Sequence, residues 1–368
     1  MRESPSLHKF MVRKNILLNP GPATTTDTVK WAQVVPDICP REKEFENIMR
    51  EIREDLVKIA GGDENYTSVL FGGSGTAVME VAISSVVHDK KLLVINNGAY
   101  GDRMAKIAKI YNIPFIDLKF ELKIELDKVE EALKNDKEIG YIAVIHHETT
   151  TGILNPIKEI GKLAKKYNCV FIVDTISSFA GVPFDIKDCN IDFMMSTSNK
   201  CIQGMAGLAF IICRKSELEK LKQYPSRTLY LDLYHQHEYF EKTGQTQFTP
   251  PVQVIYALRQ AIKEFFEEGA ENRHKRYEEN YDTLIDGMRE MGFEFLLGDD
   301  VEHSHLLTTV YEPENFNFNE IHDELYRRGF TIYPGKLSDK NTFRIAVMGA
   351  IDHDDIRRFL SVLKVINK

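Results

Sequence analysis

A glycine-rich run in this sequence has the composition of an anion-binding loop. The run GGSGT (72–76) follows an apolar stretch and precedes the helical pattern AVMEVAISSVV. Glycines let backbone N–H groups approach an anion closely, and the start of a helix adds a partial positive charge. The run lacks the Walker lysine and the GxGxxG spacing, so an ordinary strand-to-helix turn would explain it equally well.

Two ionisable residues further along the chain have positions that suit cofactor chemistry. Asp174 ends the apolar run VFIVD, where a carboxylate either caps the following loop or pairs with a protonated ring nitrogen of a cofactor. Lys200 follows another apolar run and lies among small polar residues, in STSNKCIQG (196–204). A lysine taken out of water becomes a usable amine nucleophile, although most lysines are solvated surface residues. All three features follow strand candidates, and ligands of parallel α/β sheets bind outside the carboxyl ends of strands, so we expect one shared site.

Alternating apolar runs and helical periodicity predict the elements that hold these residues. The strand candidates are TSVLF (67–71), KLLVINN (91–97), YIAVIHH (141–147), VFIVDTI (170–176), DFMMSTS (192–198) and LAFIICR (208–214). Several are apolar at consecutive positions, as in strands that are covered by helices on both faces. One intervening helix is expected to be capped by Asn155, with Pro156 in its first turn. The pattern predicts an α/β domain with a mostly parallel sheet.

The pattern changes beyond about residue 250. Long charged helices (251–268 and 271–291) lead to the strand candidates FEFLL, HLLTTVY, FTIYP and TFRIAVM, with a helix ending at Gly329 between the second and third. Asp352 is expected to cap a final helix. We predict a large α/β domain over residues 24–265 and a smaller α+β C-terminal domain over 266–368, with residues 1–23 packing nearby.

Composition excludes several classes of protein. The 368 residues carry a net charge of −8 with the basic residues scattered among acids, which is unlike a nucleic-acid-binding surface. The longest apolar stretches are of strand length, and the start of the sequence has no apolar signal region, so we expect neither a membrane span nor secretion. Five cysteines without a CxxC pair suit reduced thiols in the cytoplasm better than disulfides or a metal site.

Sequence blocks along nearly the whole chain resemble the class V aminotransferases, which are pyridoxal-5′-phosphate (PLP) enzymes of fold type I. The blocks are NPGPATTT (19–26), YTSVLFGGSGTAVME (66–80), NNGAYGDRM (96–104), HETTTGILNPI (147–157), FIVDTISSF (171–179), TSNKCIQG (197–204), SRTLYLDLY (226–234), IYPGK (332–336) and FRIAVMG (343–349). Within the family, the chain is most similar to members that transfer the amino group of 2-aminoethylphosphonate to pyruvate, giving phosphonoacetaldehyde and L-alanine. The resemblance implies a PLP-dependent transferase fold with a large domain and a small C-terminal domain.

The resemblance also implies roles for the residues of the large domain. Lys200 matches the lysine that holds PLP as a Schiff base and then moves the proton during transamination. Asp174 matches the partner of the pyridine nitrogen. The cofactor phosphate would be held by Ser74, Gly75 and Thr76.

Other matching residues would complete the cofactor and substrate sites. Tyr100 matches the aromatic residue that stacks on the pyridine ring, although a core tyrosine is the alternative. Thr149 matches the hydroxyl that bonds the phenolic oxygen, and Thr249 matches a threonine that reaches the phosphate in the neighbouring subunit. The latter implies a homodimer with shared active sites. Arg344 matches the arginine that binds the substrate carboxylate, with a structural salt bridge as the alternative.

The phosphonate of the amino donor requires an anion site of its own. Arg41 and Arg103 are hypotheses for that site, and for each a solvated surface arginine is an equal alternative. Alanine–glyoxylate and serine–glyoxylate aminotransferases also use a lysine, an aspartate and an arginine at the positions of Lys200, Asp174 and Arg344, so they stay open as alternatives. Cysteine desulfurases of this fold need a nucleophilic cysteine in the C-terminal half, and none follows Cys213. A non-catalytic PLP-binding scaffold and a nucleotide-binding protein that uses the GGSG loop are the alternatives from other classes.

Overall fold

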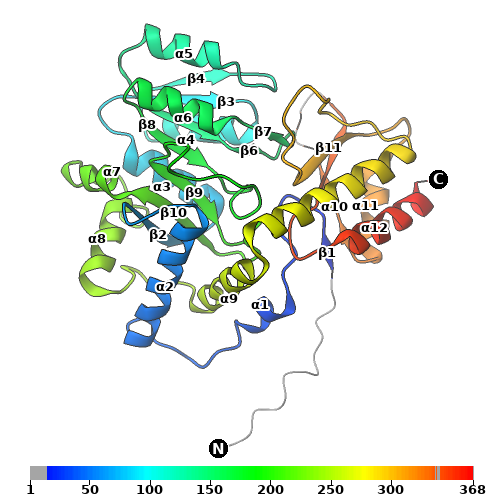
Figure 1. The fold of residues 1–368 in the computed structure, drawn as a ribbon, viewed down its shortest axis with the longest axis horizontal. Coiled ribbons are helices and arrows are strands. Elements are labelled where there is room, and N and C mark those ends of the chain that lie inside the picture. The colour runs from blue at the N-terminus through cyan, green and yellow to red at the C-terminus, as the bar shows by residue number, and fades with distance from the viewer. Residues whose placement is uncertain (1–14, 336, 338–339, 368) are drawn as a thin grey trace, which may run out of the picture.

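The computed structural model describes residues 15–335, 337 and 340–367. The chain forms a larger unit on a central sheet and a smaller C-terminal unit, and helix α10 runs from the first across the second (Figure 1). The predicted packing of residues 1–14 lies outside the described residues.

A seven-stranded sheet with the order β2-β10-β9-β8-β5-β3-β4 forms the centre of the larger unit. Its strands are β2 (Tyr66–Gly72), β3 (Lys91–Asn96), β4 (Phe115–Lys119), β5 (Ile139–Ile145), β8 (Val170–Asp174), β9 (Phe193–Thr197) and β10 (Leu208–Arg214). Strand β10 runs antiparallel to both its neighbours, and the other neighbouring pairs are parallel. The predicted α/β fold with a mostly parallel sheet is confirmed. Because β8 and β9 are parallel, the residues that follow them meet at one edge.

Helices cover both faces of this sheet, which explains why its strands are apolar at consecutive positions. One face packs against α3 (Gly75–Val86), α4 (Ala99–Ile110) and α7 (Lys215–Lys220). The other packs against α2 (Lys43–Ile59), α5 (Leu126–Asn135), α6 (Ile157–Lys166) and α9 (Val252–Glu268). Helix α8 (Leu233–Thr243) contributes to both cores, and α1 (Asp27–Trp31) packs on α9 through Val29.

The smaller unit has its own apolar core. It contains α10 (Ala270–Glu290), α11 (Phe318–Arg327), α12 (His353–Ile366) and a sheet of β11 (Leu307–Tyr311), β14 (Thr342–Ala346) and β13 (Tyr333–Pro334). Strand β1 (Ile16–Leu17) pairs in parallel with β12 (Phe330–Thr331), and Ile16 and Leu18 are buried in this core. Asp352 caps α12 in a capping box with Asp355, as predicted. The domain boundary at residue 265 stays a prediction.

Two local expectations differ from the structure, and one strand was not predicted. Asn155 does not cap α6, because its side chain is hydrogen-bonded to Asn97 and to the carbonyl of Ile145, and Pro156 occupies the N-cap position. The segment FEFLL forms a single bridge, Phe295 to Val310, in place of a strand. The edge strand β4 was not predicted, because all five of its residues are partly exposed and it lacks an apolar run.

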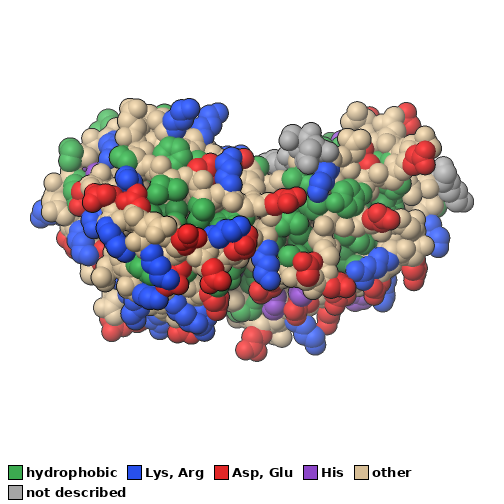
Figure 2. Space-filling model, turned by 90° about the horizontal axis from the view of Figure 1, so that it is seen from above, with side chains coloured by type: hydrophobic (Ala, Val, Ile, Leu, Met, Phe, Trp, Pro, Cys, Tyr) green, Lys and Arg blue, Asp and Glu red, His purple; other side chains and the backbone are tan. Residues whose placement is uncertain are grey.

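Acidic and basic side chains are interspersed on the face seen in Figure 2, and the molecule is hollowed between its two units. Within the described part of the chain, no helix combines the length and the apolar character that crossing a bilayer requires. All five cysteines lie in the described part and are unbridged.

Candidate active site

The glycine-rich loop forms the start of α3, at the carboxyl end of β2. Ser74 is the N-cap of this helix and its side chain makes no capping hydrogen bond. A Cβ on Gly75 would lie 3.0 Å from Ile176, so the backbone here is packed closely against the segment after β8. The first N–H groups of a helix have no intrahelical partner, and the hydroxyls of Ser74 and Thr76 flank them. This arrangement suits an anion such as a phosphate.

Lys200 lies in the turn that follows β9. The turn is closed by Gln203, whose N–H donates to the carbonyl of Lys200 at 2.8 Å and whose φ is +64°. The amine of Lys200 donates to the carbonyl of Pro20. A Cβ at Gly21 would overlap this amine, and Gly21 has a φ of +128°, so the lysine has room only because residue 21 is a glycine.

Asp174 ends β8 and is 3% exposed. One carboxylate oxygen accepts a hydrogen bond from Ile176 N at 2.7 Å. Desolvation raises the pKa of Asp174 to about 7, although the bond from Ile176 opposes the rise. A nearby protonated ring nitrogen would favour the ionised carboxylate, because opposite charges at short range offset the cost of burial.

Tyr100 lies near the glycine-rich loop, and Arg103 joins the two. Tyr100 lies in the first turn of α4, and the guanidinium of Arg103 lies 4.7 Å from the centre of its ring. Arg103 also donates to Thr76 Oγ1 at 3.0 Å. The structure therefore places Arg103 at the start of α3, beside the loop that the sequence predicts to hold phosphate.

Arg344 lies on β14 and is 2% exposed. Its Nε donates to the carbonyl of Pro334 at 3.0 Å and its Nη1 to the carbonyl of Thr149 at 3.1 Å. A guanidinium has five N–H groups, so three remain for another acceptor. Burial lowers the pKa of Arg344, and Tyr100 and Glu148 are among the groups that oppose this effect. Arg344 forms no ion pair with another described residue.

Three buried residues of the site were missed by the sequence analysis. Glu148 is completely buried in the short hairpin of β6 (His147–Glu148) and β7 (Ile153–Leu154). Both ring nitrogens of His147 and the hydroxyl of Thr197 are enclosed without a hydrogen-bond partner among the described residues. A charged residue and two histidines at the end of an apolar strand were the available signal, because such residues are rarely buried without a partner.

Two predicted residues lie apart from this group within one chain. Thr249 is exposed, and it lines a small cavity with Gly72 and Phe248. Arg41 is also exposed, and its guanidinium donates to the carbonyls of Thr246 and Gln247. The structure brings Arg41 to the segment that precedes Thr249, and its contacts do not include the buried site residues.

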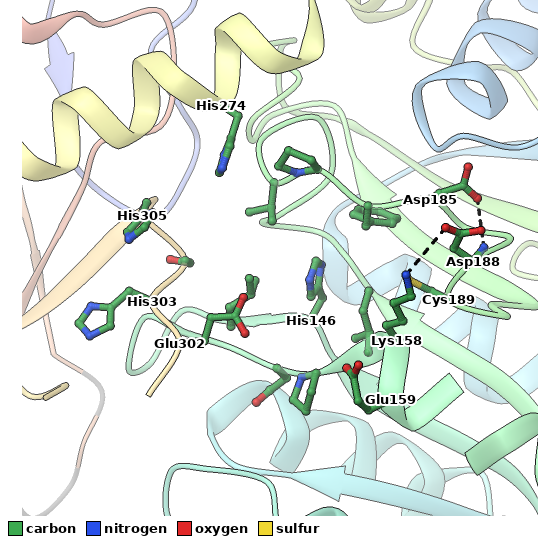
Figure 3. A pocket seen from close by; sticks show the side chains of 18 of the residues that line it. His146, Lys158, Glu159, Asp185, Asp188, Cys189, His274, Glu302, His303 and His305 are labelled. Carbon is green, nitrogen blue, oxygen red and sulfur yellow. Dashed lines mark hydrogen bonds and ion pairs between the residues drawn. The ribbon is translucent and has the colours of Figure 1, made fainter. Parts of the chain in front are cut away.

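A cavity of about 900 Å³ lies between α6 and α10. It is lined by side chains of the larger unit, such as His146 and Lys158, and of the smaller unit, such as His274 and Glu302 (Figure 3). None of the predicted site residues lines it.

The comparison with protein families identifies the chain. The family described as aminotransferase class-V matches residues 30–358. The chain is a class V aminotransferase.

Several relatives of this class V aminotransferase match over nearly its full length. It is 43% identical over 364 residues to a 2-aminoethylphosphonate–pyruvate transaminase of Phocaeicola vulgatus. The match covers 97% of this chain and 100% of that protein. It is 45% identical to a bifunctional phosphonoacetaldehyde hydrolase/aminoethylphosphonate transaminase of Clostridioides difficile, with 100% of this chain and 59% of that protein covered. The alanine–glyoxylate aminotransferase of Nostoc sp. shares the fold, with a TM-score of 0.90 at 24% identity over 99% of this chain and 98% of that one.

Class V aminotransferases depend on PLP, and the residues present in this one fit the cofactor. The start of α3 offers unpaired N–H groups and hydroxyls to a phosphate. Asp174 is a buried carboxyl with one oxygen left for a ring nitrogen. Lys200 follows the neighbouring strand β9, and its amine points to Gly21. The enclosed hydroxyl of Thr197 is a further group for which a ligand atom would supply a partner.

Proposed function

We propose that the chain catalyses the PLP-dependent transfer of the amino group of 2-aminoethylphosphonate to pyruvate, giving phosphonoacetaldehyde and L-alanine. The observation that carries this proposal is the 43% identity over the full length of a protein with that activity. The site agrees with it, because Lys200 and the buried Asp174 follow neighbouring parallel strands, and the buried Arg344 is bonded to the carbonyl of Thr149. Another class V activity on alanine or serine with glyoxylate is the alternative to test.

Lys200 and Asp174 would carry the proton chemistry. When bound, PLP supplies an electron sink that stabilises negative charge on the carbon that bears the donor's amino group. The amine of Lys200 takes the proton from that carbon, and the confined space beside Gly21 holds the amine at one place. The carboxylate of Asp174 keeps the ring nitrogen protonated, since it is buried and aimed by Ile176 N.

Arg344 would bind the carboxylate of pyruvate. Its plane is fixed by the carbonyls of Pro334 and Thr149, so its remaining N–H groups point in fixed directions. A planar guanidinium meets a carboxylate through two parallel hydrogen bonds, which selects both the charge and the orientation of the acceptor. Because Thr149 is also the residue predicted to bond the cofactor, one segment would position both the substrate carboxylate and the cofactor.

The proposal includes a homodimer in the cytoplasm. Thr249 is exposed within one chain, which suits a residue that reaches the phosphate cradle of a second subunit. The five unbridged cysteines suit a reduced compartment. A role of Arg41 in binding the phosphonate stays a hypothesis. Arg103 bonds Thr76, which favours a place for Arg103 beside the cofactor phosphate.

The absorption spectrum of the purified protein tests the activity. Addition of 2-aminoethylphosphonate without pyruvate should convert the visible band of bound PLP into the near-ultraviolet band of its aminated form. Pyruvate should then restore the first band. A band that persists with this donor and is lost with serine or alanine would refute the phosphonate substrate. If no PLP band appears after soaking with the cofactor, the proposal fails at its first step.

Replacement of Lys200 by alanine tests the assignment of the amine. The variant should lose turnover, and reduction with borohydride should no longer attach the cofactor to the chain. Mass spectrometry of the reduced protein reads this out directly. An active variant that still carries the reduced cofactor would contradict the role of Lys200.

A further inference from the structure

The buried carboxylate of Glu148 is held by hydrogen bonds from two segments. Its Oε1 accepts from Thr150 N at 2.9 Å and from Thr150 Oγ1 at 2.6 Å. Its Oε2 accepts from Tyr100 N at 3.3 Å. A Cβ at Gly98 would overlap this carboxylate, so the chain approaches it closely just before α4 begins. The carboxylate thus joins the β6–β7 hairpin to the start of α4.

Helix α4 has no cap of its own. Its N-cap residue is Gly98, which has no side chain to accept from the first N–H groups. Two acceptors from the hairpin substitute for it, because Tyr100 N donates to Glu148 and Ala99 N donates to Thr150 Oγ1 at 3.2 Å. A negative charge at this end of a helix is also favoured by the helix dipole.

The segment 148–150 is bonded on its other side to the C-terminal unit. The carbonyl of Thr149 accepts from Arg344 Nη1 at 3.1 Å, and the carbonyl of Thr150 accepts from Thr309 Oγ1 at 3.0 Å. One short segment therefore joins the helix that carries Tyr100 to the strand that carries Arg344. Any shift of this segment changes the distance between the stacking ring and the guanidinium.

We propose that Glu148 is a positioning residue, which caps α4 from a distance and thereby fixes Tyr100 relative to Arg344. The inference rests on the proposed function for the roles of these two residues. Burial of a carboxylate costs free energy unless several donors satisfy it, and here three donors do so at the start of a catalytically used helix. In this role the residue acts through the positions of Tyr100 and Arg344.

Hydrogen exchange in the PLP-free protein tests the cap without reference to activity. Glu148→Gln removes the charge and replaces one of the two accepting oxygens by an NH2 group. Thr150→Val removes the hydroxyl that bonds both Glu148 and Ala99. Both should speed exchange in the peptide that covers residues 98–104 by about fivefold, the factor that a lost helix cap implies. Thr150→Ser is the matched control, because it keeps the hydroxyl. Unchanged exchange in both disruptive variants would refute the cap.

The dissociation constant for PLP and the visible circular dichroism of the bound cofactor test positioning. Glu148→Gln and Thr150→Val should raise the dissociation constant about tenfold, in line with the loss of ordered contacts, and should change the dichroism, which reports the setting of the ring. Thr150→Ser should behave as the parent. Faster exchange with unchanged PLP binding and unchanged dichroism would mean that Glu148 is only structural, and would overturn the proposal.

Two further outcomes keep this inference separate from the proposed function. If Glu148→Gln does not fold, the comparison of Thr150→Val with Thr150→Ser still decides the question. If the variants respond as expected but the parent shows no reaction with 2-aminoethylphosphonate, the positioning role stands and the proposed substrate fails.

Discussion

Replacement of Asp174 by asparagine should stabilise the PLP-free protein at alkaline pH while it removes activity. The carboxyl group is 3% exposed and its pKa is raised to about 7 by desolvation. The unfolded chain ionises this group near the ordinary pKa of 3.8. Between these two values the folded state keeps a proton that the unfolded state has lost, so stability falls as the pH rises. Asparagine does not ionise, and its carbonyl oxygen can still accept from Ile176 N.

The size of the effect follows from the same two values. A rise from 3.8 to about 7 corresponds to about 4 kcal/mol of lost stability at pH 8, at about 1.36 kcal/mol per pH unit. At pH 5 only about 2 kcal/mol of stability has been lost, because this pH lies between the pKa of the unfolded state and that of the folded state. The advantage of Asp174→Asn over the parent should therefore grow by about 2 to 3 kcal/mol between pH 5 and pH 8. Such a penalty is a large fraction of the stability of a typical domain.

Urea unfolding of the PLP-free proteins at the two pH values measures this difference. Asp282→Asn is the matched control, because it removes a carboxyl from the exposed side of α10. Saturation with PLP should reverse the ranking, since only the parent gains an ion pair with the ring nitrogen. Parallel stability profiles for the parent and Asp174→Asn across this range would refute the argument that this carboxyl is buried at a cost.

Three other substitutions have expected outcomes. Arg344→Lys should raise the KM for pyruvate about 100-fold in steady-state kinetics, because an ammonium cannot form the paired hydrogen bonds, and an unchanged KM would contradict the assignment. Gly21→Ala should prevent borohydride from attaching PLP to Lys200, because the added methyl group overlaps the lysine amine. Gly292→Ala is the control, since Gly292 also has a positive φ but has open space around it, and PLP should still attach. Mass spectrometry of the reduced proteins distinguishes the two outcomes. Thr249→Ala should speed the release of PLP, measured by dialysis, and sedimentation of the parent as a stable active monomer would remove the reason for this effect.

The positions of the main site residues followed from the sequence because strand ends are local features. Asp174 and Lys200 each follow an apolar run, and the carboxyl ends of parallel strands meet at one edge. The glycine-rich loop lies at the same edge because β2 is parallel to β9 across the intervening β10. Patterns of burial and turns therefore predicted which residues the fold brings together.

The remaining features depend on partners that are distant in sequence. In the sequence, Glu148 is a charged residue just after an apolar run, and its role becomes visible only when Gly98 and Tyr100 are found beside it. Asn155 has the residue type of a helix cap, but its side chain forms buried hydrogen bonds with Asn97 instead. Strand β4 lies at an edge, where one side is solvated and an apolar run is not required.

The pairing of β1 with β12 makes the order of synthesis matter. Ile16 pairs with Phe330 although roughly 300 residues separate them. Just after Ile16 in the sequence, Pro20 and Ala23 contact the turn that carries Lys200. A ribosome releases the first strand long before its partner exists, so the strand must wait, unpaired, while the large sheet folds. The turn that carries Lys200 then gains its contacts with the segment 20–23 only after β12 has emerged and paired with β1. A nascent chain arrested before residue 330 should hold a folded sheet but an unfinished place for the cofactor.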